Sequence, residues 1–206
     1  MGNLWDERFN QNQYVYGTEP NPFVKQIIHR LKGKRLLTIA EGEGRNAVFL
    51  AEHGFQVTAW DYSKVGLEKT KALAKQRGVH VHTELVDLER VQWKENEWDL
   101  IINIWGHISG NQKAGLLQGI AKAIKPGGMY ATEVYSVHQL DYKTGGPSSR
   151  EMLYAPEDIL HNFPNWKYLH FYYGEATRNE GALHTGLSHV IQALIQKEAA
   201  PKQQTL

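Results

Sequence analysis

The sequence predicts an α/β fold: a doubly wound, mostly parallel sheet of seven strands with a C-terminal antiparallel hairpin and helices on both faces. Strand-type apolar runs alternate with amphipathic helical stretches through most of the chain. The run Leu100-Ile101-Ile102 is apolar without alternation, as in a strand that is buried on both faces. Near the C-terminus two long strand-type runs flank the turn-like Arg178-Asn179-Glu180-Gly181, which predicts a hairpin.

The expected strands are short apolar runs bounded by turn signals or helix starts. In chain order they cover residues 36–40, 55–60, 79–86, 98–104, 129–135, 166–175 and 183–195. The first five alternate with helices and should therefore be parallel, whereas the last two follow one another through a turn and should pair antiparallel.

Capping residues mark the expected helices. Asn21 before Pro22 is typical of an N-cap followed by the first helical position, and Ser63 can cap a second helix. The helices are expected at residues 22–31, 64–77, 111–124 and 156–162, and a further one carries Ala47, Val48, Leu50 and Ala51 and ends at residue 53. Glycines follow several of these ends, as at His53-Gly54 and Lys125-Pro126-Gly127-Gly128, and glycine suits the C-terminal turn of a helix.

The length of 206 residues fits one domain. We expect a single domain over residues 1–196, in which the aromatic segment 1–20 covers the ligand site. Residues 197–206 lose apolar periodicity and are expected to form a disordered tail.

Composition excludes several classes of protein. A formal net charge of +1 argues against a dedicated nucleic-acid binder, which usually carries a basic excess. No apolar run reaches the roughly 20 residues that a membrane span needs, and the N-terminus lacks the pattern of a signal peptide. The chain contains no cysteine, which suits a cytoplasmic protein. Oligomeric state cannot be predicted from these features.

A glycine loop follows the first expected strand. Ligands of open α/β sheets bind beyond the carboxyl ends of the strands, and here the strand runs into Glu41-Gly42-Glu43-Gly44. Glycine lets backbone approach a ligand and adopt positive φ. Asp61 ends the next strand, where a carboxylate can accept hydrogen bonds from ribose hydroxyls. Together these residues predict a nucleoside site.

The loop alone does not select the cofactor. Gly42-x-Gly44-x-x-Ala47 also matches the fingerprint of nicotinamide dinucleotides. Asp87-Leu88, after the third strand, could bind an adenine amino group and pack against its ring. Glu41 and Glu43 would repel a pyrophosphate but tolerate a sulfonium cation, and the chain ends in a hairpin instead of a second mononucleotide half.

Taken together, these residues resemble the class I S-adenosylmethionine-dependent methyltransferases over nearly the whole chain. Within this class the sequence is similar to the small bacterial branch related to tellurite-resistance methyltransferases. That closer likeness is carried by Trp5-Asp6-Glu7-Arg8-Phe9, Tyr14-Val15-Tyr16-Gly17-Thr18-Glu19-Pro20-Asn21, Gly44-Arg45-Asn46-Ala47 and Thr144-Gly145-Gly146-Pro147.

The resemblance implies a Rossmann-like fold, S-adenosyl-L-methionine as cofactor and methyl transfer to a small-molecule acceptor by in-line displacement. No nucleic-acid or membrane partner is expected. The expected cofactor-binding residues are Glu41, Gly42, Glu43, Gly44, Asp61, Tyr62, Ser63, Asp87, Leu88 and Ile104.

On the acceptor side, His107 and Tyr16 are the candidate catalytic residues, with Tyr14, Tyr135 and Gly145-Gly146 beside them. An acceptor that is already anionic needs no general base, so a missing catalytic dyad is compatible with an enzyme. We expect no metal site. His80 and His82 alternate on one face of a strand, but no third ligand accompanies them.

Three positions depart from the family pattern. The family usually has an acid at Thr38, a glycine at Ala40 and a small residue at Glu41. Ala40 would be strained if its φ were positive, and we hypothesise that Glu41 replaces the missing acid. Two further readings stay open: a non-catalytic nucleoside-binding protein with a degenerate fold, and an NAD-dependent oxidoreductase.

Overall fold

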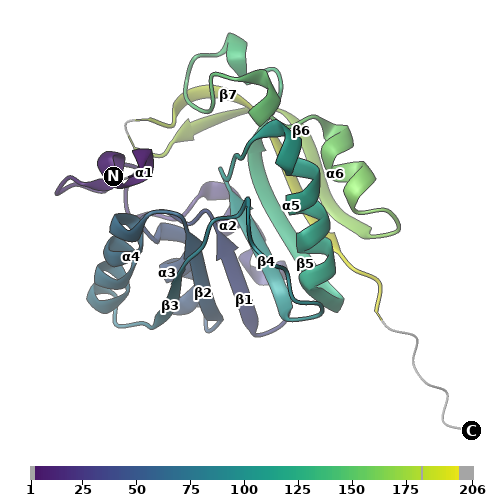
Figure 1. Ribbon diagram of the computed structural model, residues 1–206, viewed down its shortest axis with the longest axis horizontal. Helices are drawn as coiled ribbons and strands as arrows, with labels where there is room; N and C mark the ends of the chain where they lie inside the picture. Colours follow the sequence, from purple (N-terminus) through teal and green to yellow (C-terminus); the bar gives the residue numbers. More distant parts are fainter. Residues whose placement is uncertain (1–2, 182, 200–206) are drawn as a thin grey trace, which may run out of the picture.

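The computed structural model describes residues 3–181 and 183–199. Within these residues the strands form one seven-stranded sheet in the order β3-β2-β1-β4-β5-β7-β6 (Figure 1). The strands are β1 (Arg35–Ile39), β2 (Gln56–Asp61), β3 (Val81–Leu85), β4 (Trp98–Ile104), β5 (Ile124–Tyr135), β6 (Lys167–Asn179) and β7 (Thr185–Gln196). β1 to β5 pair in parallel, and β7 pairs antiparallel with both β5 and β6. The predicted fold class is confirmed.

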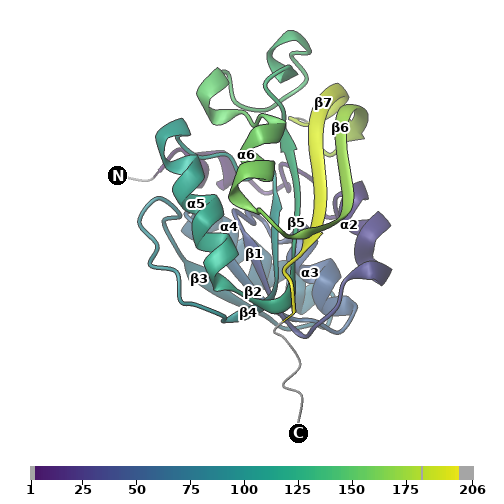
Figure 2. The same ribbon diagram turned by 90° about the vertical axis from the view of Figure 1, so that its right-hand side faces the viewer.

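The helices form two layers around this sheet. They are α1 (Leu4–Phe9), α2 (Pro22–Ile27), α3 (Arg45–Glu52), α4 (Lys64–Gln76), α5 (Gly110–Ala123) and α6 (Pro156–Asn162), with short 3-10 turns at Ile28–Arg30, Gln139–Asp141 and Arg150–Met152. One buried apolar cluster joins α2, α3 and α4 to one face of the sheet. A second joins α5 and α6 to the other face, and Figure 2 shows α5 and α6 on one side of the molecule with α2 and α3 on the other.

The central strands are buried on both faces because neighbouring residues enter different clusters. Leu36 of β1 packs with α2 to α4, whereas Leu37 packs with α5 and α6. The same division separates Leu100 from Ile101 in β4. This alternation explains the continuous apolar run in the sequence, since each side of a parallel sheet needs its own apolar set.

The chain reverses direction across the sheet between β1 and β4. β1 is followed by β2 on one side, while its other neighbour is β4. Such a reversal leaves a crevice at the carboxyl ends of the two strands. The glycine loop therefore lies where the sequence predicts a ligand.

Several predicted boundaries are wrong. The segment at Leu4–Phe9 is a helix, α1, which the aromatic and polar pattern did not reveal. The helix that begins after Asn21 ends at Ile27 and continues as a 3-10 turn. β5 begins at Ile124, because Ile124 pairs with Trp98 before a register shift leads to the Leu100–Met129 pair.

The hairpin also differs from the prediction. Arg178 and Asn179 belong to β6 and pair with Gly186 and Thr185, although the sequence placed them in the turn. Arg178 extends the strand because its guanidinium binds Glu133 in the core.

The expected tail starts at Lys197, whose ammonium binds the carbonyls of Ala121 and Ile124. Residues 200–206 lie outside the described part. No helix in the described residues is long and apolar enough to cross a membrane.

Candidate cofactor and acceptor site

Gly42 and Gly44 give the loop after β1 its left-handed conformation, with φ of 65° and 92°. A Cβ on Gly44 would lie 2.7 Å from the Cα of Thr70, so a larger residue would push α4 away from the loop. Gly42 faces the other way, and a Cβ there would lie 3.2 Å from the ring of Phe9. The two glycines are therefore required by close packing as well as by φ.

Two non-glycine residues with positive φ lie at the ends of neighbouring strands. Ala40, after β1, has φ of 50°, and Trp105, after β4, has φ of 61°. Left-handed conformations in residues with a Cβ cost on the order of 1–3 kcal/mol and gather at functional sites. Ala40, at a position where the family usually has glycine, therefore carries backbone strain.

Asp61 closes the loop from the end of β2. Its Oδ2 accepts the Gly42 amide at 2.7 Å, and its Oδ1 accepts the Ser63 amide at 2.7 Å. Burial raises its pKa to about 6, although these amides favour the ionised form. The carboxylate that we expected to bind a ribose thus also holds the two loops in place.

Glu41 caps α3. Its Oε1 accepts the amides of Asn46 and Ala47 at 3.0 and 2.8 Å, and a carboxylate is favourable at a helix N-terminus. Desolvation nevertheless raises its pKa to about 7. The hydroxyl of Thr38 and the charge of Arg45 oppose that rise. Glu41 therefore supports the loop that begins the helix.

Lys69 ties the N-terminal segment to the loop. Its ammonium donates to the carbonyls of Phe9, Gln11 and Gln13 at 3.2, 2.9 and 2.8 Å and to Glu43 at 2.5 Å. The other oxygen of Glu43 accepts the Val15 amide at 2.8 Å. Residues 9–15 are consequently held against the glycine loop through Lys69 and Glu43.

The same segment is also attached through α1. Asp6 Oδ1 accepts the hydroxyl of Ser63 at 2.6 Å and the amide of Val65 at 3.2 Å. Asn3 donates to the carbonyl of Tyr62, whose ring is exposed. Two residues expected around the cofactor, Tyr62 and Ser63, thus contact α1 in this structure.

The remaining cofactor-side residues lie at the edges of the crevice. Asp87 Oδ1 accepts the Glu89 amide at 3.0 Å, and Leu88 packs against the α5–α6 cluster. Ile104 is buried at the end of β4 in the opposite cluster. They lie at the carboxyl ends of two strands, β3 and β4, where ligands of open α/β sheets bind.

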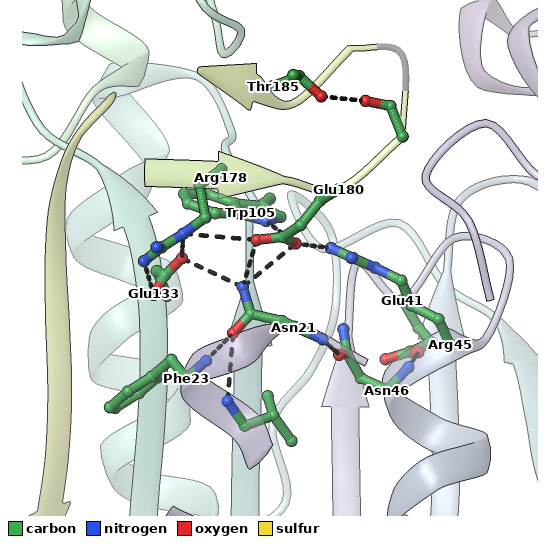
Figure 3. A network of polar contacts seen from close by, with 12 residues as sticks. Asn21, Phe23, Glu41, Arg45, Asn46, Trp105, Glu133, Arg178, Glu180 and Thr185 are labelled. Atoms are coloured by element: carbon green, nitrogen blue, oxygen red, sulfur yellow. Dashed lines mark hydrogen bonds and ion pairs between the residues drawn. The ribbon is translucent and has the colours of Figure 1, made fainter. Parts of the chain in front are cut away.

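A buried network of four charges joins the cofactor half to the hairpin (Figure 3). Arg178 of β6 binds Glu133 of β5 through two bonds of 2.7 Å. Glu180 pairs with Arg45 and accepts the indole N–H of Trp105 at 3.1 Å. Each of these four charged side chains is 7% exposed or less. The two positive and two negative charges balance, which a buried site requires.

Asn21 lies at the centre of this network. Its Nδ2 donates to Glu133 at 3.1 Å and to Glu180 at 3.0 Å. Its Oδ1 accepts the amides of Phe23 and Val24, so the predicted N-cap is confirmed, and Figure 3 shows both roles together. The side chain that starts α2 thereby also positions two carboxylates.

Sequence reasoning missed Glu133, Arg178 and Glu180. One signal was present: Glu133 interrupts an otherwise apolar strand, and a charge at such a place needs a buried partner. The partner itself could not be read from the sequence, because Arg178 seemed to belong to a turn.

His107, a candidate catalytic residue, already uses both ring nitrogens. Nδ1 lies 2.9 Å from the carbonyl of Met152, and Nε2 accepts the Tyr135 amide at 3.3 Å. Burial lowers its pKa to about 4. A neutral imidazole with Nδ1 protonated satisfies both contacts, so in this structure His107 connects β5 to the Arg150–Met152 turn.

Tyr16, the other candidate, lies in a group of aromatic rings. Its ring is 4.6 Å from that of His184, and its hydroxyl accepts a bond of 3.3 Å from Arg8. Tyr135 stacks on Trp105 at 4.2 Å and meets His184 edge-on at 5.4 Å. The structure thus brings Tyr16 and Tyr135 together through His184, which the sequence had not assigned to the site.

Of the other residues expected on the acceptor side, some lie near Tyr135 and some do not. Gly145 and Gly146 lie against Tyr135, since a Cβ on either would come within 3.0 Å of that side chain. Tyr14 instead contacts α4, where its hydroxyl donates to the Lys69 carbonyl at 3.3 Å. His80 is exposed and His82 binds Glu84. Within residues 3–181 and 183–199, no group of three or more His, Cys, Asp or Glu side chains could hold a metal ion.

The residues around the loop fit a nucleoside cofactor with a positive centre. Left-handed glycines, the strand-end carboxylate of Asp61 and the carboxylates of Glu41 and Glu43 lie in or beside the loop after β1. Carboxylates complement a sulfonium or ammonium group, whereas they would repel a pyrophosphate.

Comparison with known proteins shows which family this chain resembles. Residues 36–128 match the model of a family described as a methyltransferase domain. The chain resembles class I S-adenosylmethionine-dependent methyltransferases. A probable S-adenosyl-L-methionine-dependent methyltransferase of Haemophilus influenzae, TehB, is 22% identical over 152 residues, which cover 73% of this chain and 50% of the relative. The predicted resemblance to S-adenosylmethionine-dependent methyltransferases is confirmed, and this resemblance implies S-adenosyl-L-methionine as the cofactor.

Solved structures agree with the fold. A structure described under the conversion of a disulfide bond into a thioacetal group in echinomycin biosynthesis has a TM-score of 0.74 at 15% identity, covering 96% of this chain and 89% of its own. The crystal structure of TehB from Haemophilus influenzae has a TM-score of 0.71 at 15% identity, covering 94% and 66%. The [4+2]-cyclase SpnF has a TM-score of 0.66 at 14% identity, covering 92% and 88%. The chain spans about half the length of the curated relatives it matches.

Proposed function

We propose that this protein binds S-adenosyl-L-methionine in the crevice between β1 and β4 and transfers its methyl group to a small-molecule acceptor. One observation carries the proposal: the left-handed Gly42–Gly44 loop and Asp61 lie at the switch point of a methyltransferase-type sheet. When bound, the cofactor supplies a methyl carbon that its sulfonium has already activated.

The residues of the chain then have separate tasks. The backbone of residues 41–44 and the Asp61 carboxylate hold the nucleoside, and Asp87 with Leu88 borders its base. Residues 9–15, fixed by Lys69, exclude water from above. Holding two reactants in line is worth roughly 7–11 kcal/mol, so positioning can supply most of the required catalysis.

A small acceptor is favoured over a macromolecule. The segment over the loop and the hairpin tip meet: a Cβ on Gly181 would lie 2.2 Å from the Val15 carbonyl. This enclosure leaves little room for a polymer, and the net charge of +1 gives no electrostatic attraction for nucleic acid. We keep the cytoplasm as the proposed location, which the cysteine-free sequence suits.

A test of cofactor binding uses Asp61→Asn with Asp99→Asn as a matched control. Asp99 also accepts two backbone amides, those of Lys34 and Arg35, but it lies near the amino end of β4, away from the carboxyl ends of the strands. We expect Asp61→Asn to weaken S-adenosylmethionine binding about tenfold or more, as the loss of a charged hydrogen-bond acceptor predicts. The Kd of Asp99→Asn, measured by calorimetry, should match that of the wild type.

Thermal shift separates the cofactor classes. S-adenosylmethionine or S-adenosylhomocysteine at about 100 times its Kd should stabilise the fold by roughly 2.7 kcal/mol. Stabilisation by NADH alone would show that the proposal is wrong. Binding without release of S-adenosylhomocysteine, across thiols, phenols and selenite, would instead favour a non-catalytic binding protein. Two observations favour non-catalytic binding as the second candidate function: the strained backbone at Ala40 and the N-terminal segment that lies over the loop.

A further inference from the structure

Two buried polar atoms lie together on the acceptor side. Among the described residues, neither the Tyr135 hydroxyl nor Nδ1 of His184 has a hydrogen-bond partner. Tyr135 is fully buried and His184 is 7% exposed. Buried polar groups are nearly always paired, so two such groups in one place point to a ligand that supplies their partners.

Gly145 borders both side chains. A Cβ built on Gly145 would lie 3.0 Å from the Tyr135 hydroxyl and 3.1 Å from Cδ2 of His184. The two rings meet edge-on, with centroids 5.4 Å apart. Gly145 therefore lies against both side chains, next to the Tyr135 hydroxyl and the Cδ2 edge of the His184 ring.

The loop of Thr144, Gly145 and Gly146 is fixed at Thr144 and places no side chain over the Tyr135 ring. Thr144 Oγ1 donates to the Leu187 carbonyl at 2.7 Å and lies 2.9 Å from Ser188 Oγ. Gly145 and Gly146 follow with φ of 134° and 86°, a conformation that favours glycine. A Cβ on Gly146 would lie 2.7 Å from the Tyr135 ring. The glycine pair thus lies against the Tyr135 ring without a side chain of its own, and Thr144 fixes its start.

The surroundings select an uncharged ligand with a flat apolar body. Trp105 stacks on Tyr135, and Tyr16 lies against His184. Burial, together with the charge of Arg45, lowers the pKa of His184 to about 3, and burial raises the pKa of Tyr135. Both groups are neutral at physiological pH, so the phenol can donate and an imidazole nitrogen can accept.

We propose that Tyr135 and His184, beneath the Gly145–Gly146 loop, bind the methyl acceptor, and that this acceptor carries an un-ionised hydroxyl or thiol on a flat apolar body. Such a group accepts a hydrogen bond from the Tyr135 hydroxyl and donates one to Nδ1 of His184. The inference rests on the proposed function, since it names the acceptor class of that site.

Binding of phenol and anisole to the full chain with saturating S-adenosylhomocysteine tests the inference. Phenol can accept and donate, whereas anisole, its methyl ether, can only accept. A typical hydrogen bond changes an affinity about fivefold, so phenol should bind about fivefold more tightly than anisole. His184→Phe should abolish this preference, and Tyr135→Phe should weaken both ligands. Nitrogen chemical shifts of labelled histidine should report phenol at His184 Nδ1.

Two further variants distinguish a ligand contact from a structural role. Tyr135→Phe removes an unpaired buried hydroxyl, so its melting temperature should equal or exceed that of the wild type. Gly145→Ala should weaken phenol binding but leave the Kd of S-adenosylhomocysteine unchanged.

Equal affinities for phenol and anisole in the wild type, or an unchanged preference in His184→Phe, would overturn the inference. So would selenite that competes with phenol more strongly than anisole does, because the acceptor class would then be anionic. Failure of S-adenosylhomocysteine to bind would instead count against the proposed function, which keeps the two failures separate.

Discussion

The two halves of the strand-end crevice differ in how their polar groups are paired. On the cofactor side, Asp61, Glu41 and Glu43 each accept backbone amides of the loops that they support. On the acceptor side, the Tyr135 hydroxyl and His184 Nδ1 are buried without a partner in the described part of the chain. The cofactor half is thus internally complete, and the acceptor half is not.

Under the proposed function, the two halves have different tasks, which would explain the contrast. A loop that binds a fixed cofactor gains from being held in one conformation before the ligand arrives, because the cost of ordering it is removed from binding. A polar group that binds an acceptor has no partner within the protein before the acceptor arrives. Its desolvation therefore lowers the stability of the ligand-free fold. Arg45, Arg178, Glu133 and Glu180 connect the two halves.

The largest effect is expected from breaking this connection. Arg178→Met leaves Glu133 and Glu180 buried with one cation fewer, and removal of one partner from a buried ion pair costs about 3–5 kcal/mol. The free energy of unfolding in urea should fall by that amount.

A double variant and a surface control sharpen this result. Arg178→Met with Glu133→Leu should lose less than Arg178→Met alone, since an apolar pair needs no countercharge. Lys71→Met, which breaks an exposed pair with Glu68, should change stability by less than about 0.5 kcal/mol. A loss near this size for Arg178→Met would mean that the network does not join the halves.

An intermediate effect is expected from Glu41→Gln, which tests the cost of charge on the cofactor side. The pKa of Glu41 rises from its ordinary value of 4.5 to about 7 in the folded state. The folded protein therefore retains a proton that the unfolded chain has released, and stability falls as the pH rises from about 4.5 through about 7. Glutamine keeps the acceptor oxygen for α3 but does not titrate.

Glu41→Gln should accordingly gain on the order of 1–3 kcal/mol over the wild type at pH 8. The gain should shrink toward pH 4.5 and be measurable as melting temperature against pH. Glu68→Gln, on the exposed face of α4, serves as the control and should show no such gain. A wild-type profile that rises between pH 5 and 7 while Glu41→Gln follows it would contradict this account. Unchanged S-adenosylmethionine affinity in Glu41→Gln would remove the hypothesis that Glu41 replaces the family's acid.

The smallest effect is expected from Ala40→Gly, which relieves strain without touching a polar group. Ala40 has φ of 50°, and a left-handed residue with a Cβ costs roughly 1–2 kcal/mol. After the entropy of the extra glycine is subtracted, the net gain should be about 0.5–1 kcal/mol in chemical denaturation. Ala47→Gly, in the first turns of α3, should lose about 1 kcal/mol. Equal losses in both variants would show that Ala40 is not strained.

Much of the fold was readable from local sequence. The alternation of apolar and amphipathic segments predicted the sheet, and the capping residues Asn21 and Ser63 predicted two helix starts that the structure confirms. The boundaries failed where a tertiary contact extended an element, as when Glu133 draws Arg178 into β6. A local pattern cannot reveal a partner that lies elsewhere in the chain.

The sequence by itself determined the sheet, the glycine loop and the strand-end acid, because periodicity, glycine and chain order act over short distances. Only the tertiary structure decided that Ala40 is left-handed, that both nitrogens of His107 are engaged, and that His184 meets Tyr135. These properties depend on which distant side chains the folded sheet brings together, and on which buried atoms it leaves for a ligand.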